Sequence, residues 1–245
     1  MDQVFQTTFH VDGTLTDCFD RLKPSAILYF VQEVASKHCQ MLQLDWDTLA
    51  SRRMFWAIIR HKVHITRMPL KNETITVETW PMPTTRVAFP RSVAGYDAAG
   101  NELFRSISIW VLMDLDQRTM ILPGKSGIHV PGLLRGSELA TPTSLMPAAL
   151  SAEEQRQVRF TDLDINGHMN NCRYLDWICD LLPSGFHHSH TMKEFTLCYL
   201  AEARENDRLK LQWELVENGT LRVETVRHSE TDDQDHRIFS ASIQY

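Results

Sequence analysis

Apolar residues recur at helical spacing twice along the chain. Between residues 24 and 43 they fall three and four positions apart behind Pro24, and proline suits the first turn of a helix. A shorter pattern covers residues 170–183 and is apolar on nearly every side, which is typical of a buried helix. The sequence therefore predicts one long helix in the first half and one short helix in the second.

After each helix the period changes to two, the spacing of a strand with one buried face. The alternating runs are 54–68, 73–80, 85–97 and 102–114 in the first half, and 193–203, 208–216, 220–228 and 237–245 in the second. A helix followed by an antiparallel meander is an α+β pattern, and here it occurs twice.

The two halves also resemble each other in sequence. The stretch NETITVETW (72–80) overlaps 206–213 (NDRLKLQW) at an offset of 134, with residues 72–79 aligned, and residues 103–110 (LFRSISIW) align with 238–245 at an offset of 135. Two matches at nearly the same offset indicate a duplicated unit. Residues 123–152 are rich in Gly, Pro, Ser and Thr without a sustained period, which predicts a linker. We expect a first domain at 1–125, a linker at 126–155 and a second domain at 156–245.

The charge of the chain narrows the classes of partner. A formal net charge of −6 argues against nucleic acid, because binding phosphates requires a basic face. The acidic excess is C-terminal: residues 1–130 hold 14 Lys and Arg against 13 Asp and Glu, and residues 131–245 hold 11 against 18. No stretch approaches the ~20 apolar residues of a membrane span, and the first residues show no targeting peptide. We therefore expect a cytoplasmic protein with no membrane partner.

Cysteine and histidine usage gives no sign of a metal or a cofactor. The five cysteines are an odd number without a CxxC pair, which argues for reduced thiols rather than disulfides or structural zinc. The HHSH stretch at 187–190 follows Pro-Ser-Gly-Phe and has no cysteine or carboxylate at ligand spacing, so we expect a surface loop there.

The most unusual local sequence is FTDLDINGHMNNCRYLDWI at 160–178. Asp164, Asn166 and His168 alternate just before the short helix, and an extended segment would point all three to one side. The backbone N–H groups of the helix start, near Gly167, could then hold a carbonyl oxygen. Acyl transfer needs these parts: a base or nucleophile, oxyanion donors and an imidazole. The alternative is that Asp164 and Asn170 only cap the turn and the helix.

The first copy provides an internal comparison. Its helix start, FDRLKPSAILYF, has no Asp-x-Asn-x-His pattern. A purely structural motif should be needed in both copies, so its presence in one favours a functional role there.

At these residues the chain resembles the acyl-acyl-carrier-protein thioesterases of fatty-acid synthesis. The resemblance rests on DLDINGHMNNCRYLDWI (162–178), on the Tyr-x-x-Glu strand in 195–211, and on FDRLKPSAILYFVQEVA and SISIWVLMD in the first half. It implies two tandem hot-dog domains, each a central helix wrapped by an antiparallel β-sheet. It also implies hydrolysis of fatty acyl-[acyl-carrier-protein], which releases free fatty acid and ends chain elongation.

The resemblance implies that Asp164, Asn166, His168 and Glu202 are catalytic. At the 134 offset the first copy has Met68 in place of Glu202, so we expect that copy to lack every member of the set. Plant members of the family have a cysteine directly after this glutamate. Here that position is Ala203, which excludes it as a nucleophile and leaves carboxylate chemistry, either by direct attack or by activation of water. The helix-start residues expected to contact the substrate are Gly167, Asn170 and Asn171.

In the resembled family the first domain supplies the acyl pocket. The apolar residues available for it here are Met54, Phe55, Trp56, Ile58, Val87, Phe89 and Trp110, although such residues also form ordinary sheet cores. Acyl carrier protein is acidic, and the basic residues that could receive it are Arg52, Arg53, Arg60, Lys62, Arg67, Arg86 and Arg91.

Two rival functional classes stay open at this stage. The chain could be an acyl-CoA thioesterase, or a non-catalytic acyl-binding or dehydratase-like hot-dog protein. A homodimer is also compatible with the sequence.

Overall fold

The computed structural model describes residues 3–136, 138–229, 231 and 233–245. The chain divides into two compact units, Met1–Pro142 and Thr143–Tyr245. Both have the expected hot-dog arrangement of one main helix and an antiparallel sheet. In the described part of the chain, no helix combines the length and the apolar character needed to cross a bilayer.

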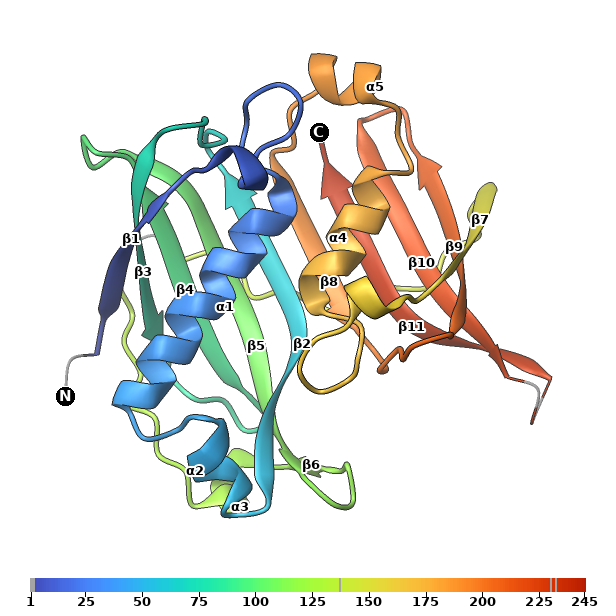
Figure 1. Cartoon of the computed structure of the whole chain (residues 1–245). Helices are drawn as coiled ribbons and strands as arrows, with labels where there is room; N and C mark the ends of the chain where they lie inside the picture. Colours follow the sequence, from blue (N-terminus) through green and yellow to red (C-terminus); the bar gives the residue numbers. More distant parts are fainter. Residues whose placement is uncertain (1–2, 137, 230, 232) are drawn as a thin grey trace. The chain divides into compact units, whose positions relative to one another are not determined.

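The first unit wraps a five-stranded sheet around one long helix (Figure 1). The strands run in the order β1-β3-β4-β5-β2, all antiparallel, and β6 pairs with β5. The elements are β1 (Phe5–His10), η1 (Gly13–Leu15), α1 (Pro24–Met41), α2 (Trp46–Ala50), β2 (Met54–Ile65), β3 (Thr74–Pro81), β4 (Phe89–Tyr96), β5 (Glu102–Asp114), β6 (Met120–Ile121) and α3 (Pro123–Ser126).

Helix α1 confirms the long helix predicted from the apolar spacing. Pro24 occupies its first turn, and the face that includes Ile27, Phe30 and Val31 is buried. The helix ends in a Schellman motif, in which Gln43 has a positive φ of 59° and the Leu44 N–H donates to the Cys39 carbonyl at 2.8 Å.

The second unit repeats this plan with a shorter helix (Figure 1). Its strands run β8-β11-β10-β9-β7, again antiparallel. The elements are β7 (Ala152–Gln157), η2 (Phe160–Asp162), α4 (Asn171–Cys179), α5 (Ser184–Ser189), β8 (Glu194–Tyr199), β9 (Arg208–Leu215), β10 (Thr220–Ser229) and β11 (Gln234–Gln244). Residues 187–189 of the HHSH stretch belong to the short helix α5 rather than to a loop, and His190 is its C-cap. The ring Nε2 of His187 lies 2.8 Å from the Cys179 carbonyl oxygen.

The duplication extends to matching irregularities in the two sheets. The β4–β5 register skips Leu103, and the β10–β11 register skips Ile238, at the predicted offset of 135. Each bulge leaves a carbonyl that accepts two N–H groups from the end of another strand. The donors are Thr66 and Arg67 to Leu103, and Leu200 and Ala201 to Ile238, at 2.9 and 3.1 Å in both units.

The segment predicted as a linker is largely tied to the units. Ile128 and Val130 are buried in the first unit, and the Leu133 N–H donates to the Pro81 carbonyl at 2.9 Å. The units divide after residue 142, and β7 begins inside the expected linker of 126–155. Residue 137 of that segment lies outside the described residues.

Candidate active site

The segment that holds Asp164, Asn166 and His168 is a tight turn between η2 and α4. The Asp164 N–H donates to the His168 carbonyl at 2.8 Å, and the Gly167 N–H donates back to the Asp164 carbonyl at 3.0 Å. Gly167 has a positive φ of 73°, which suits glycine at the end of such a turn. The prediction of an extended segment is therefore wrong, and the turn rather than strand alternation sets where the three side chains lie.

Asp164 stabilises this turn with its own side chain. Its Oδ1 accepts the backbone N–H of Asn166 at 2.8 Å and, more weakly, that of His168 at 3.4 Å. This is an Asx-type turn, in which a short carboxylate replaces a backbone acceptor.

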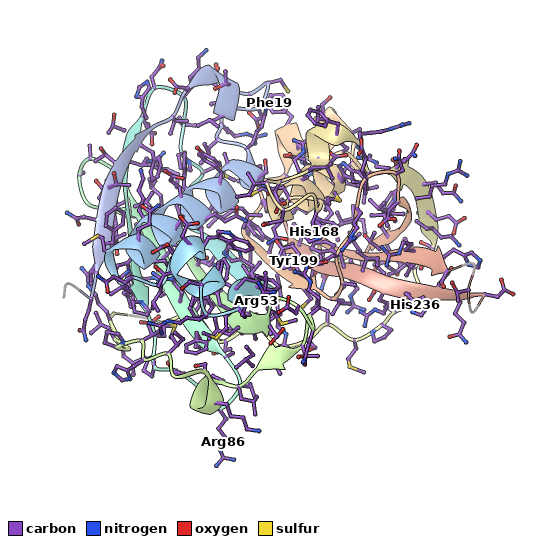
Figure 2. All side chains as sticks on the ribbon, turned by 60° about the horizontal axis from the view of Figure 1, so that its bottom comes forward. Phe19, Arg53, Arg86, His168, Tyr199 and His236 are labelled. Atoms are coloured by element: carbon purple, nitrogen blue, oxygen red, sulfur yellow. The ribbon has the colours of Figure 1, made fainter. Side chains whose placement is uncertain are left out.

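Glu202 and His168 come together from separate segments. The Oε2 atom of Glu202 lies 3.1 Å from Nε2 of His168. The histidine side chain is 18% exposed and that of the glutamate 42%, so the pair is partly buried and still accessible to solvent. Figure 2 labels His168 together with Tyr199, the last residue of β8.

Backbone pairing holds the two segments at this distance. His168 forms an antiparallel bridge with Arg204, and the Met169 N–H donates to the Ala203 carbonyl at 2.8 Å. Tyr199 adds a link to the helix, because its hydroxyl donates to the Asn171 carbonyl at 3.2 Å. Burial raises the pKa of Tyr199 well above its usual value, so this hydroxyl keeps its proton.

The remaining residues expected near the substrate differ in whether their hydrogen-bonding groups are already used within the protein. The Gly167 N–H is already bonded to Asp164, and the Asn170 side chain caps α4 by accepting the Cys172 N–H at 2.9 Å. By contrast, the exposed Asn166 side-chain amide makes no hydrogen bond to any described residue. Asn171 is the first residue of α4 and is partly exposed.

The first unit contains the same turn without the same chemistry. Asp17 replaces Asp164, and its Oδ1 accepts the N–H groups of Phe19 and Arg21 at 2.9 and 3.0 Å. The Asp17 N–H donates to the Arg21 carbonyl at 2.7 Å, and the Leu22 N–H to the Pro69 carbonyl at 2.8 Å. The expectation that this copy lacks every member is therefore wrong for the aspartate.

The offset explains why sequence comparison missed Asp17. The turns match at 164 − 17 = 147, whereas the strands match at 134, because the first unit has extra residues between them, among them those of the longer α1 and the longer β2. Phe19 and Arg21 stand where the second unit has Asn166 and His168, and Met68 stands for Glu202. Asn166, His168 and Glu202 are thus specific to the second unit.

The expected acyl-pocket residues separate into two groups. Met54, Trp56, Phe89 and Trp110 belong to one apolar cluster of the first unit, where the Trp56 and Phe89 rings meet edge to face at 5.0 Å. Phe55 instead lies beside Trp46, with Arg118 over its ring, and Val87 is exposed. Ile58 is buried in β2.

The basic residues of the first unit also differ in availability. Arg91 is buried, with its Nη1 donating to Thr79 Oγ1 at 3.1 Å and lying 3.0 Å from Nδ1 of His38, so it cannot be part of a surface patch. Arg53 is paired with Asp116, and Arg67 with Glu73. Arg52 and Arg86 are exposed, and Figure 2 shows Arg86 projecting from the ribbon.

The two cysteines near the site are poorly suited as nucleophiles. Burial raises the pKa of Cys172 to about 12. Cys198 is buried, with its Sγ 3.7 Å from the Thr143 carbonyl oxygen. Among the described residues, no group of three or more His, Cys, Asp or Glu could hold a metal ion.

Comparison with known proteins follows the same division into two units. Residues 2–122 match the acyl-ACP thioesterase N-terminal domain, and residues 147–245 match the acyl-ACP thioesterase C-terminal domain. The chain is 27% identical over 201 residues to oleoyl-acyl carrier protein thioesterase 2, chloroplastic, of Arabidopsis thaliana, covering 74% of this chain and 54% of that protein. It thus spans about half the length of the curated relatives it matches.

Solved structures share the fold over the whole chain. The 12:0-ACP thioesterase from Umbellularia californica superposes with a TM-score of 0.83 at 21% identity, covering 100% of this chain and 97% of that one. An acyl-ACP thioesterase from Bacteroides thetaiotaomicron gives a TM-score of 0.80 at 22% identity, covering 99% and 97%. With both family domains matched in order along its length, the chain belongs to the acyl-ACP thioesterase family.

Proposed function

We propose that the protein hydrolyses the thioester of fatty acyl-[acyl-carrier-protein], releasing a free fatty acid and the carrier thiol. The observation that supports this is the contact between His168 and Glu202 in one of two otherwise matching turns, a turn that also carries the Asn166 amide, which bonds to no described residue. The plant relatives it matches are named as oleoyl-, palmitoyl- and dodecanoyl-acyl carrier protein thioesterases or hydrolases.

The chemistry requires a base, an oxyanion donor and a proton for the leaving group. In the proposed reaction the His168–Glu202 pair takes a proton from water, and the resulting hydroxide attacks the thioester carbonyl carbon. The Asn166 amide donates to the carbonyl oxygen as it becomes negative. The C–S bond then breaks, and the pair returns the proton to the leaving thiolate.

Asp164 has a second possible part in this reaction besides shaping the turn. Its Oδ1 is held by backbone N–H groups, whereas no described hydrogen bond uses its Oδ2. A carboxylate oxygen of this kind could assist as base or attack the carbonyl directly.

Substitution of the three ionisable groups tests the proposal. We expect Asp164→Asn, His168→Ala and Glu202→Gln each to lower turnover of acyl-carrier-protein thioesters by about 100-fold or more, the usual effect of losing a base or an oxyanion donor. The assay should use graded chain lengths, and the same acyl chain on coenzyme A. Near-normal hydrolysis by all three variants would exclude the mechanism.

Asp17→Asn provides a matched control. It makes the same chemical change in the equivalent turn of the first unit, where arginine and methionine replace His168 and Glu202. Asparagine can still accept the N–H groups of the turn. We expect Asp17→Asn to leave turnover within about twofold. If Asp164→Asn behaves the same way, Asp164 serves the turn alone.

A further inference from the structure

The position of Glu202 depends on a strand end whose backbone is bonded on both sides. Before it, the Leu200 and Ala201 N–H groups donate to the Ile238 carbonyl, and after it the Ala203 carbonyl accepts the Met169 N–H. The first unit makes all of these bonds at the matching positions around Met68. They therefore belong to the fold and do not explain how a catalytic carboxylate is held in the second unit.

One further contact acts on Glu202 itself. Arg227, on β10, donates from Nη1 to the Glu202 carbonyl oxygen at 3.2 Å and to Asp207 Oδ2 at 2.6 Å. Asp207 Oδ2 also accepts the Arg204 N–H at 2.9 Å. The guanidinium thus links Glu202 to the turn that follows it. Strand β10 holds the guanidinium in place because β10 is paired with a strand on each side.

The first unit makes the equivalent bridge with a different arginine. Arg67 donates to the Met68 carbonyl at 3.4 Å and to both oxygens of Glu73, at 2.8 and 3.1 Å. At the 134 offset, Glu73 corresponds to Asp207 and Arg67 corresponds to Ala201. In the second unit the arginine therefore comes from across the sheet, and the position next to the glutamate is a small, exposed alanine.

We propose that Arg227, together with Asp207, is a positioning residue that sets the distance between the Glu202 carboxylate and His168. The inference rests on the proposed function of that pair. The reason is geometric: the carboxylate is partly exposed, and it lies 3.1 Å from His168 Nε2 and 3.7 Å from Arg204 Nη2, so its distance to His168 depends on where the Glu202 backbone is held. A shift of about 1 Å in a reacting group can lower the rate by about 100-fold.

The principal test replaces the guanidinium and measures kcat, KM and Tm. We expect Arg227→Met to lower kcat about 10- to 100-fold while KM changes less than about twofold, because the lost contact orients the base and does not touch the substrate. Glu73→Gln weakens the matching bridge in the first unit and is expected to lower Tm without changing kcat. If Arg227→Met does not fold, Arg227→Lys tests the same point, since an ammonium cannot reproduce the planar bridge.

A second-site arginine provides the decisive comparison. The double variant Ala201→Arg with Arg227→Met rebuilds the first unit's version of the bridge, and we expect it to regain most of the lost kcat. An unchanged kcat in Arg227→Met would overturn the inference, as would a double variant that regains Tm but not kcat. If the unaltered protein hydrolyses no acyl-carrier-protein thioester, the proposed function fails. If Glu202→Gln keeps full turnover, the role of the His168–Glu202 pair fails, and if only Arg227→Met does, the positioning role alone fails.

Discussion

The two carboxylates expected to be catalytic make different contacts, and these contacts distinguish their roles. Asp164 is bonded to the backbone through Oδ1, as Asp17 is in the first unit, so this side-chain oxygen stabilises the turn in both copies. Glu202 contacts His168 and has only Met68 as its counterpart. The comparison between copies therefore assigns the His168–Glu202 pair to the chemistry of the second unit more firmly than it assigns Asp164.

The cysteines allow a simple prediction at the residue scale. Since burial raises the pKa of Cys172 to about 12, its reactive thiolate is scarce near neutral pH, whereas Cys18 is exposed. We expect iodoacetamide to modify Cys18 and to spare Cys172, as read by mass spectrometry. Cys172→Ala should retain turnover within about twofold. Labelling of Cys172 as fast as Cys18, or loss of activity in Cys172→Ala, would contradict this.

At the scale of elements, periodicity predicted both main helices and eight strands, because each has a regular buried face. It missed β1 and β7, which are edge strands of mainly polar composition in which apolar alternation gives little signal. It also missed the turn at 164–168, since alternating polar residues fit both a strand and an Asx turn. Arg227 had no sequence signal at all, because its partners are brought to it only by the sheet.

One buried histidine makes the first unit sensitive to acid. His61 on β2 is fully buried, with its Nε2 2.6 Å from Ser106 Oγ, and burial lowers its pKa to about 3 from an ordinary 6.5. Above pH 6.5, the His61 imidazole is neutral in both the folded and the unfolded state. As the pH falls from 6.5 towards 3, only the unfolded state gains the proton, so the free energy of unfolding decreases by about 1.4 kcal/mol per pH unit.

The buried His61 predicts a difference in how steeply the free energy of unfolding changes with pH. Urea unfolding across that pH range measures the free energy of unfolding at each pH. As the pH falls, this free energy should decrease less steeply for His61→Gln than for the unaltered protein, and the difference in slope should correspond to about one fewer proton taken up on unfolding. Glutamine can still bond to Ser106 but does not titrate in this range. Parallel curves for the two proteins would show that His61 does not contribute to acid sensitivity.

For the whole molecule, duplication separates requirements of the fold from those of chemistry. Bulges and turns occur in both units and preserve the strand end, whereas the carbonyl–guanidinium–carboxylate bridge uses arginines from different positions, Arg67 in the first unit and Arg227 in the second. The histidine, the glutamate and the free amide occur only in the second, whose half of the sequence also holds the acidic excess. The near-neutral first half is thus the better candidate to receive an acidic carrier.

Docking by charge in the first unit can be tested with Arg52 and Arg86, two exposed arginines there that form no ion pair with a described residue. Reversal of both to glutamate should lower kcat/KM for an acyl-carrier-protein substrate about 10-fold at low salt, through slower association, with kcat unchanged. The difference should shrink as salt screens the charges, and it should be absent for the same acyl chain on coenzyme A. Arg222→Glu, an exposed change on β10 of the second unit, is the matched control. An equal effect of Arg222→Glu, or a defect independent of salt, would mean that Arg52 and Arg86 do not form the docking surface.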